Sequence, residues 1–258
     1  MSMKFFRNLT VFTMVALLAL SNIAAFAQTE SQEEVLLTAH ELARFDGQEG
    51  RKAYVAVDGV IYDLTASPAW GNGQHNGFEA GRDLTEEIKK DSPHGVAMLD
   101  RVPAVGRLLI ELSLEELAAF NGKDGQKAYV AVDGVIYDMT ASRAWGNGQH
   151  NGFEAGRDLT KEIKEISPHG VVKLENVVEV GRLVVKLTVE ELAEFDGTDG
   201  KPAYVAVDGV IYDVSQSQSW AQGEHFGHLA GTDLTEGFAD SPHDLGIFDN
   251  TPVAGYIK

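Results

Sequence analysis

Three pairs of histidines stand at equivalent places along this chain. In each pair one histidine lies in a glycine-rich stretch, five residues after a tryptophan, and the other directly follows a Ser-Pro dipeptide. The pairs are His75 and His94, His150 and His169, and His225 and His243. Neutral imidazole nitrogens bind metals, and two opposed imidazoles suit a haem iron that is ligated along both axial directions. A single loop histidine would be an ordinary surface residue, so the inference depends on the repetition of the pair.

The same residues offer a second kind of metal site. His75, Asp83 and His94 make a two-histidine, one-carboxylate set of the kind that binds non-haem iron or zinc. Asp83 directly precedes Leu84 and Thr85, however, and a helix cap is the favoured role for it there. The chain has no cysteine, which excludes disulfides, thiolate-bound metal and covalent haem attached through a Cys-x-x-Cys-His motif.

The histidine pairs belong to an internal repeat of 75 residues. The sequence GNGQHNGFEAGRDLT occupies residues 71–85 and again 146–160, and a diverged version, AQGEHFGHLAGTDLT, occupies 221–235. A unit of this length can fold as a small domain with its own core. We therefore expect three domains, at residues 36–110, 111–185 and 186–258.

The third copy has diverged the most. It keeps both histidines, although Phe226 replaces the asparagine found at Asn76, and Asp244 replaces the glycine found at Gly95. His228, three residues after His225, is a rival ligand that the other copies lack. The third copy is therefore the one whose metal site is in question.

Local signals within each copy predict a small mixed α+β domain. A capping box opens a short helix in each copy, at 38–41, 113–116 and 188–191. The segment AYVAVDGVIYD is two β runs joined by Asp-Gly, a strong hairpin signal. The histidine loop follows, then a short helix at DLTEEIKK, a further helix opened by Ser-Pro-His, and a last strand at VGRLL. The two histidines of a copy thus flank one helix, which can form the wall of a pocket.

Two further features favour a haem pocket. Glycines surround the first histidine, at Gly71, Gly73, Gly77 and Gly81, and would let the backbone approach a flat macrocycle closely. The second histidine is expected in the first turn of its helix, where the positive end of the helix dipole disfavours the protonated ring. A neutral ring is free to ligate iron.

The first 27 residues have the pattern of a secretory signal peptide. Lys4 and Arg7 precede an apolar run, and small residues end at Ala27, where we expect cleavage. The apolar run is shorter than the roughly 20 residues of a spanning helix, which disfavours a membrane anchor. The mature chain carries 19 basic and 39 acidic residues, a net charge of −20. Such a surface disfavours nucleic acid and favours a basic partner, although plain solubility explains the charge equally well.

The ordered set of motifs resembles the cytochrome b5-like haem-binding family and is most similar to its short bacterial branch. The set comprises the helix cap, AYVAVDGVIYD, a tryptophan, GxHxG, AGxDLT, SPHG and VG, and covers essentially the whole mature chain three times. The resemblance implies small cytochrome b5-like domains that hold non-covalent haem b, up to three per chain, each between two histidines. The implied iron ligands are His75, His94, His150, His169, His225 and His243.

The chain departs from the family pattern in the histidine loop. The usual His-Pro-Gly-Gly becomes His-Asn-Gly-Phe from His75 onward, and the connection to the following Gly-Arg-Asp is shorter. The shortening is similar to the membrane-associated progesterone-receptor branch, in which a tyrosine ligates the haem. The loop here has no tyrosine, which favours histidine. Tyr54 and Tyr62 remain candidate ligands or hydrogen-bond donors, but packing in the strand core is the favoured role for both.

These features lead us to expect an exported tri-haem b-type cytochrome, periplasmic or extracellular, that transfers single electrons. We expect a redox partner with a basic surface, no nucleic acid, and no membrane insertion after signal cleavage. No flavin, nicotinamide or molybdenum domain accompanies the repeats, so an enzyme is not expected. One alternative is a haem carrier, or a binding protein for a steroid-like ligand, that uses the same pockets. The other is a hydrolase or oxygenase with a non-haem metal, which would have no Soret band.

Overall fold

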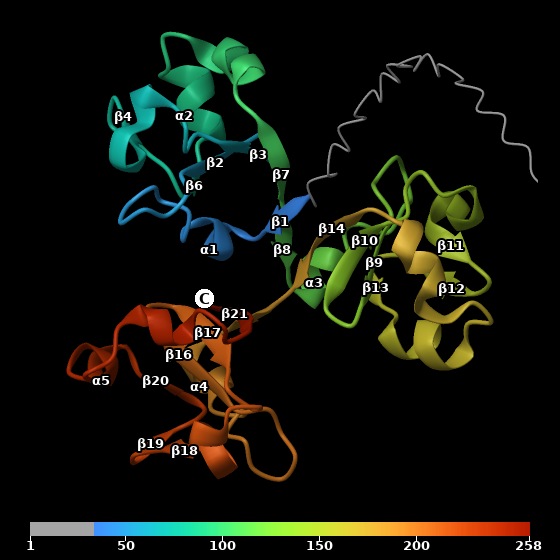
Figure 1. Ribbon diagram of the computed structural model, residues 1–258. Coiled ribbons are helices and arrows are strands. Elements are labelled where there is room, and N and C mark those ends of the chain that lie inside the picture. The colour runs from blue at the N-terminus through green and yellow to red at the C-terminus, as the bar shows by residue number, and fades with distance from the viewer. Residues whose placement is uncertain (1–33) are drawn as a thin grey trace, which may run out of the picture. The chain divides into compact units, whose positions relative to one another are not determined.

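The computed structural model describes residues 34–258 and contains three five-stranded mixed sheets, one in each repeat (Figure 1). The sheets extend over residues 35–108, 110–183 and 185–257. The α+β class is therefore confirmed, while the domain limits given above stay predictions. The expected signal peptide, 1–27, lies outside the described residues. Within residues 34–258 no helix has the length and apolar character that crossing a membrane requires.

The first repeat sets the pattern of strands and helices. Its elements are β1 (Val35–Leu37), α1 (Ala39–Leu42), β2 (Tyr54–Val57), β3 (Val60–Asp63), a 3-10 helix (Pro68–Gly73), β4 (Gln74–His75), β5 (Phe78–Glu79), β6 (Arg82–Asp83), α2 (Thr85–Lys90), a second 3-10 helix (Gly95–Arg101) and β7 (Ala104–Leu108). The sheet order is β1-β7-β3-β2-β6. The two outer pairs, β1 with β7 and β2 with β6, are parallel, and the two inner pairs are antiparallel.

The second and third repeats follow the same order. The second comprises β8 (Ile110–Leu112), α3 (Leu114–Leu117), β9 (Tyr129–Val132), β10 (Val135–Asp138), β11 (Gln149–His150), β12 (Phe153–Glu154), β13 (Arg157–Asp158) and β14 (Glu179–Leu183). The third comprises β15 (Val185–Leu187), α4 (Val189–Leu192), β16 (Tyr204–Val207), β17 (Val210–Asp213), β18 (Glu224–His225), β19 (His228–Leu229), β20 (Thr232–Asp233), α5 (Thr235–Ala239) and β21 (Val253–Ile257). Where the first repeat has α2, the second has a π-helix, Glu162–Ile166.

The local signals in the sequence produced the expected elements. Strands β2 and β3 form an antiparallel hairpin. Its two turn residues, Asp58 and Gly59, both have positive φ, 52° and 76°, which is the conformation that an Asp-Gly hairpin turn requires. The capping box of α1 is complete, because the Thr38 side chain accepts from the Glu41 N–H and the Glu41 carboxylate accepts from the Thr38 N–H. The same reciprocal pair opens α3 and α4.

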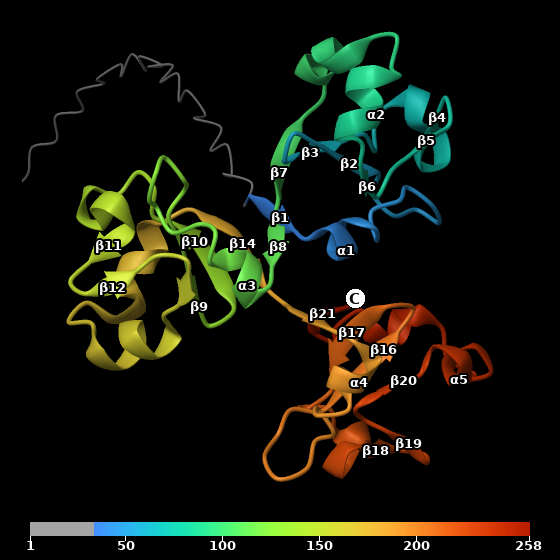
Figure 2. The ribbon, with the colours of Figure 1, turned by 180° about the vertical axis from the view of Figure 1, so that it is seen from behind.

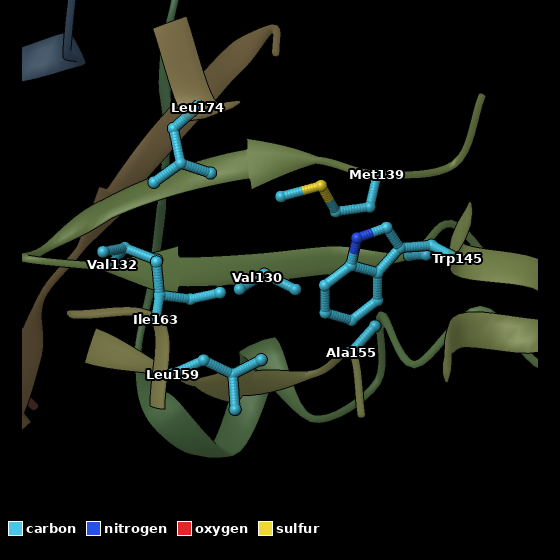
Figure 3. Packing of buried hydrophobic residues seen from close by; sticks show 9 residues of the cluster. Val130, Val132, Met139, Trp145, Ala155, Leu159, Ile163 and Leu174 are labelled. Carbon is cyan, nitrogen blue, oxygen red and sulfur yellow. The ribbon is translucent and has the colours of Figure 1, made fainter. Parts of the chain in front are cut away.

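Each sheet is covered on both faces, which explains why all four residues of β2 are buried. We call one layer the far-side core; in the first repeat its buried members are Leu42, Tyr54, Ala56 and Ile61. The other layer is the histidine-side core, and in the first repeat it is centred on Val55, Val57, Leu64, Leu84 and Ile88. Figure 3 shows the histidine-side core of the second repeat, with Trp145, Met139 and Val130 gathered beside the central strands.

Candidate functional site

The first histidine of each repeat lies on a small hairpin, at the side of the unit away from its last long strand (Figure 2). In the first repeat this is β4–β5, in which His75 pairs directly with Phe78. Its turn is Asn76-Gly77, with φ of 49° and 86°. The sequence predicts a loop here, whereas the structure has a hairpin; the Asn-Gly dipeptide at its turn is the hairpin signal that corresponds to it.

A backbone hydrogen bond fixes the ring of this histidine. His75 Nδ1 lies 2.9 Å from the carbonyl oxygen of Ala69. A carbonyl only accepts, so Nδ1 carries the proton and Nε2 keeps the lone pair that a metal needs. Such a partner on the second ring nitrogen is the usual way in which proteins orient a ligating histidine.

The other two repeats reproduce this arrangement. The Nδ1 atoms of His150 and His225 lie 3.0 and 2.9 Å from the carbonyl oxygens of Ala144 and Ser219. In all three repeats the tryptophan ring of the preceding segment lies against the imidazole, with centroids 5.5, 5.6 and 5.3 Å apart. The three rings are therefore held in the same tautomer and by the same neighbours.

His75 and His94 line one cavity in the first repeat. The cavity has a volume of about 480 Å³, and its apolar walls come from both sides of α2. Its largest apolar side chains are Leu64, Trp70, Phe78, Ile88, Met98 and Leu99. The structure thus brings together the two histidines that the sequence paired, on either side of the intervening helix. Their assignment as axial ligands, and that of the other two pairs, stays a prediction.

One polar lining residue was missed by the sequence analysis. Arg101, at the end of the second 3-10 helix, lines the same cavity. The repeat pattern gave no signal for it, because Asn176 and Asn250 stand at its place in the other copies. A guanidinium beside an apolar cavity suits a ligand that carries carboxylates.

The segment of the second histidine differs from the expectation. His94 was expected in the first turn of a helix, but the helix is of the 3-10 type and begins one residue later, at Gly95. Gly95, the first residue of this helix, has a φ of 53°, so the residue after His94 is left-handed and His94 lies outside the helix. The dipole argument for a neutral His94 therefore does not hold. Its backbone N–H donates to Ser92 Oγ at 3.3 Å, and His94 lines the cavity.

Two of the four glycines near the first histidine, Gly73 and Gly81, serve packing, whereas Gly71 and Gly77 border open space. A Cβ at Gly73 would lie 1.6 Å from the carbonyl oxygen of Asp46, and a Cβ at Gly81 would lie 3.0 Å from that of Ala43. Both glycines have positive φ, 71° and 84°. They are needed where the histidine loop rests on the segment that follows α1, so the expectation was wrong for these two positions.

The structure does not bring His75, Asp83 and His94 together as a metal site. Asp83 Oδ1 accepts from the N–H of Thr85, the first residue of α2, at 3.0 Å, although the N-cap itself is Leu84, and Asp83 is absent from the cavity lining. No group of three side chains able to hold a metal ion occurs in the described part of the chain. Tyr54 is buried in the far-side core and Tyr62 packs against the histidine-side core, as the favoured interpretation had it.

Comparisons with known proteins agree with this architecture. The family model described as "Cytochrome b5-like Heme/Steroid binding domain" matches residues 113–184 and 188–257, more than half of the chain. A cytochrome b5 domain protein of Methanococcoides burtonii is 43% identical and aligns over 29% of this chain and 97% of its own, with a TM-score of 0.28. A cytochrome b5 domain protein of Hadesarchaea YNP_N21 is 41% identical over 29% and 100%, also with a TM-score of 0.28.

A third solved structure is more distant. A hypothetical protein of Arabidopsis thaliana, described as having a cytochrome b5 like fold, is 26% identical over 29% of this chain and 91% of its own, with a TM-score of 0.24. The search of curated proteins returned no match. The family match, together with three repeated mixed sheets, settles the classification: the chain belongs to the cytochrome b5-like heme/steroid binding domain family.

Proposed function

We propose that this chain is an exported b-type cytochrome that transfers single electrons through as many as three haem groups, each held between two histidines. One observation carries the proposal: His75 and His94 line the same cavity, and the bond from His75 Nδ1 to the Ala69 carbonyl leaves Nε2 free to bind. The same bond recurs at His150 and His225. The family match supports haem as the ligand.

The residues of the first repeat fit a haem group. His75 Nε2 and the His94 ring would supply the two axial nitrogens. Asn76 Nδ2 lies 3.2 Å from His75 Nε2 and would release this contact on binding. The apolar walls, including Ile88 and Leu99, would exclude water from the macrocycle, and Arg101 would pair with a carboxylate at its edge. When bound, haem supplies an iron that cycles between the ferric and ferrous states.

Filled axial positions favour electron transfer over catalysis. Two protein ligands leave no open position at the iron for a substrate. We therefore propose a carrier of electrons rather than an enzyme. The acidic surface, with 39 acidic residues in the chain, would attract a basic redox partner in a salt-dependent way. Cleavage after Ala27 would place the protein in the periplasm or outside the cell.

A second candidate function rests on the character of the cavity walls. An apolar cavity of about 480 Å³ lies within the size range of sites for small apolar ligands. A haem carrier, or a protein that binds a steroid-like molecule, would use the same space. It would differ from a cytochrome by an exchangeable iron ligand or by the absence of haem.

An absorption spectrum tests the proposal. We expect the haem-loaded chain to show low-spin bands when oxidised and sharp α and β bands when reduced with dithionite. His94→Ala and His169→Ala should each remove one haem per chain, whereas His40→Ala, on α1 and outside the cavity lining, should remove none. A high-spin spectrum would favour the carrier, and the absence of a Soret band would overturn haem binding altogether.

A further inference from the structure

The third repeat differs from the first at the positions that line the cavity. Eleven lining residues of the first repeat have a different type in the third. The changes on the histidine hairpin, on α2 and on or beside the second 3-10 helix include Asn76 to Phe226, Phe78 to His228, Ile88 to Phe238, Leu99 to Phe248 and Val102 to Thr251. The second repeat carries Ile163 and Leu174 at two of these places, the same residue types as the first.

Aromatic side chains pack together where the first repeat has aliphatic ones. Phe248 is buried and stacks on Tyr212, with centroids 4.0 Å apart and planes at 13°. Phe238 joins the same group, 5.6 Å from Phe248. Tyr212 itself is buried, whereas its counterparts Tyr62 and Tyr137 are only partly buried. The three rings form a packed unit in the third histidine-side core.

Burial alone does not distinguish the third repeat. Leu174 of the second repeat is also buried, while Leu99 of the first is only partly so. A leucine at this position of the repeat is therefore buried in one copy and only partly buried in another. Two phenyl rings are larger than the leucine and isoleucine they replace, and stacking between aromatic rings stabilises a packed core beyond the burial of apolar area. Separating these side chains to admit a ligand consequently costs more free energy in the third repeat than in the second.

The backbone that carries the second histidine also differs in the third repeat. Helix α5 has five residues where α2 has six, and the following 3-10 helix has four where the first repeat has seven. Asp244, at the position of Gly95, has a φ of −106° instead of 53°, and its carboxylate accepts from the Gly246 N–H at 2.9 Å. His243 thus precedes a segment of different conformation from the one that follows His94 and His169.

On the histidine hairpin of the third repeat, the polar ring of His228 stands where the first repeat has the apolar ring of Phe78. His228 pairs with His225 across β18 and β19, at the place where Phe78 lines the first cavity. Its Cε1 atom lies 3.4 Å from where a Cβ of Gly237 would be, so the ring rests against α5. A glycine inside a helix is less favourable than alanine, so Gly237 weakens the helix that separates the two histidines.

We propose that the third repeat binds haem far more weakly than the first two, that the chain therefore loads two haems, and that Phe238 and Phe248 are the residues that close the third site. This inference rests on the proposed function, because it concerns the same cofactor. The third repeat keeps the histidine pair and the fixed Nδ1 bond, but it places Phe238 and Phe248 where the first repeat has the cavity-lining residues Ile88 and Leu99.

Titration of the full chain with haemin, followed by its Soret band, tests the inference. We expect two tight equivalents for the unaltered chain and no change in that number for the double variant His225→Ala, His243→Ala. The double variant Phe238→Ile, Phe248→Leu should raise the number to three. The matched reverse change in the first repeat, Ile88→Phe with Leu99→Phe, should lower it to one.

The outcomes separate this inference from the proposed function. Three tight equivalents in the unaltered chain would overturn the inference and leave the proposed function standing. No bound haem in any variant would overturn both. Thermal unfolding of each variant with and without haemin provides a second readout: a variant that gains or loses a site should show a larger or smaller shift on haemin addition. A folded Phe238→Ile, Phe248→Leu chain that still binds two would also contradict the inference.

Discussion

The two faces of each sheet differ in how far the three repeats have diverged. The far-side core has the same residue types in every copy, and its members are buried except for Tyr204, which is partly buried. Its members are Leu42, Tyr54, Ala56 and Ile61 in the first repeat, Leu117, Tyr129, Ala131 and Ile136 in the second, and Leu192, Tyr204, Ala206 and Ile211 in the third. On the histidine side, by contrast, Leu64 becomes Met139 and then Val214, while Ile88 and Leu99 become phenylalanines in the third copy.

The far-side core therefore accounts for the stability of each repeat, and the histidine side accounts for the chemistry of its site. The far-side core fixes the sheet and its stacked aromatic pair, such as Phe45 on Tyr54 at 4.6 Å. A close-packed core of this kind tolerates little change in volume. The histidine side borders a cavity, so its residues can change size without loss of the fold. The repeats can therefore differ in ligand binding while they share one scaffold.

The largest expected effect comes from a far-side truncation. Ile61 is fully buried, so Ile61→Ala should lower the unfolding free energy of the first repeat by about 2–5 kcal/mol. Leu99→Ala, on the cavity wall, should cost only about 1 kcal/mol because that side chain is already partly exposed. Denaturant unfolding followed by the fluorescence of Trp70, with Trp145 and Trp220 replaced by phenylalanine, measures both. Equal losses would refute the distinction between the faces.

A smaller effect is expected at the turn of the histidine hairpin. Phe226 has a φ of 47° and is 92% exposed, where the other repeats place Asn76 and Asn151 at 49° and 50°. A left-handed conformation costs an ordinary residue about 1–2 kcal/mol, and asparagine tolerates it. Phe226→Asn should therefore stabilise the third repeat by about 1 kcal/mol.

The reverse change provides the control. Asn76→Phe should destabilise the first repeat by a similar amount or slightly more, since it also removes the contact from Asn76 to His75 Nε2. Thermal unfolding of both variants without haem measures the pair. A stabilising Asn76→Phe would show that contacts of the exposed ring, and not the backbone conformation, decide the stability of this turn.

The sequence predicted the elements whose cause is local. The Asp58-Gly59 turn and the Thr38 capping box depend on neighbouring residues, and both are present as expected. The parallel pairing of β1 with β7 was not predicted, because it joins Val35 to Gly106 and no short motif records so distant a contact. The β4–β5 hairpin was missed because each of its strands has only two residues.

Part of the site was also predictable, because it depends on residues that lie close together in the sequence. The spacing of His75 and His94 around one helix was enough to place both on a cavity. The hydrogen bond from His75 to Ala69 depends on how the loop folds back, and the cavity role of Arg101 occurs in one copy only. The packing roles of Gly73 and Gly81 were not predicted, because the backbone they contact, at Asp46 and Ala43, lies 27 and 38 residues earlier in the chain. Such contacts follow from the tertiary fold and not from local sequence.

The smallest expected effect concerns Asp46, whose backbone packs against the histidine loop. Asp46, whose carbonyl oxygen packs against Gly73, forms a two-bond ion pair with Arg51, and both distances are 2.9 Å. The hydrogen bonds from Arg51 hold the pKa of Asp46 below its ordinary value. In the second repeat Asn121 and Gln126 stand at these places, so that repeat carries no charge there.

Lowering the pH should therefore remove a small stabilisation from the first repeat. The second repeat lacks this ion pair and should show no such loss. A carboxyl with a lowered folded-state pKa contributes stability above its ordinary pKa, near 3.9, and loses it as the pH falls through the lowered value. Arg51→Gln should bring the pKa of Asp46 back toward that of a free aspartate and should lower the first repeat's stability slightly at neutral pH. The difference from the unaltered chain should vanish at low pH and shrink in high salt, because the pair is partly exposed to solvent. Carboxyl titration by NMR, with unfolding measured at neutral and acid pH, checks the sign, and a difference that grows on acidification would exclude the ion pair as its cause.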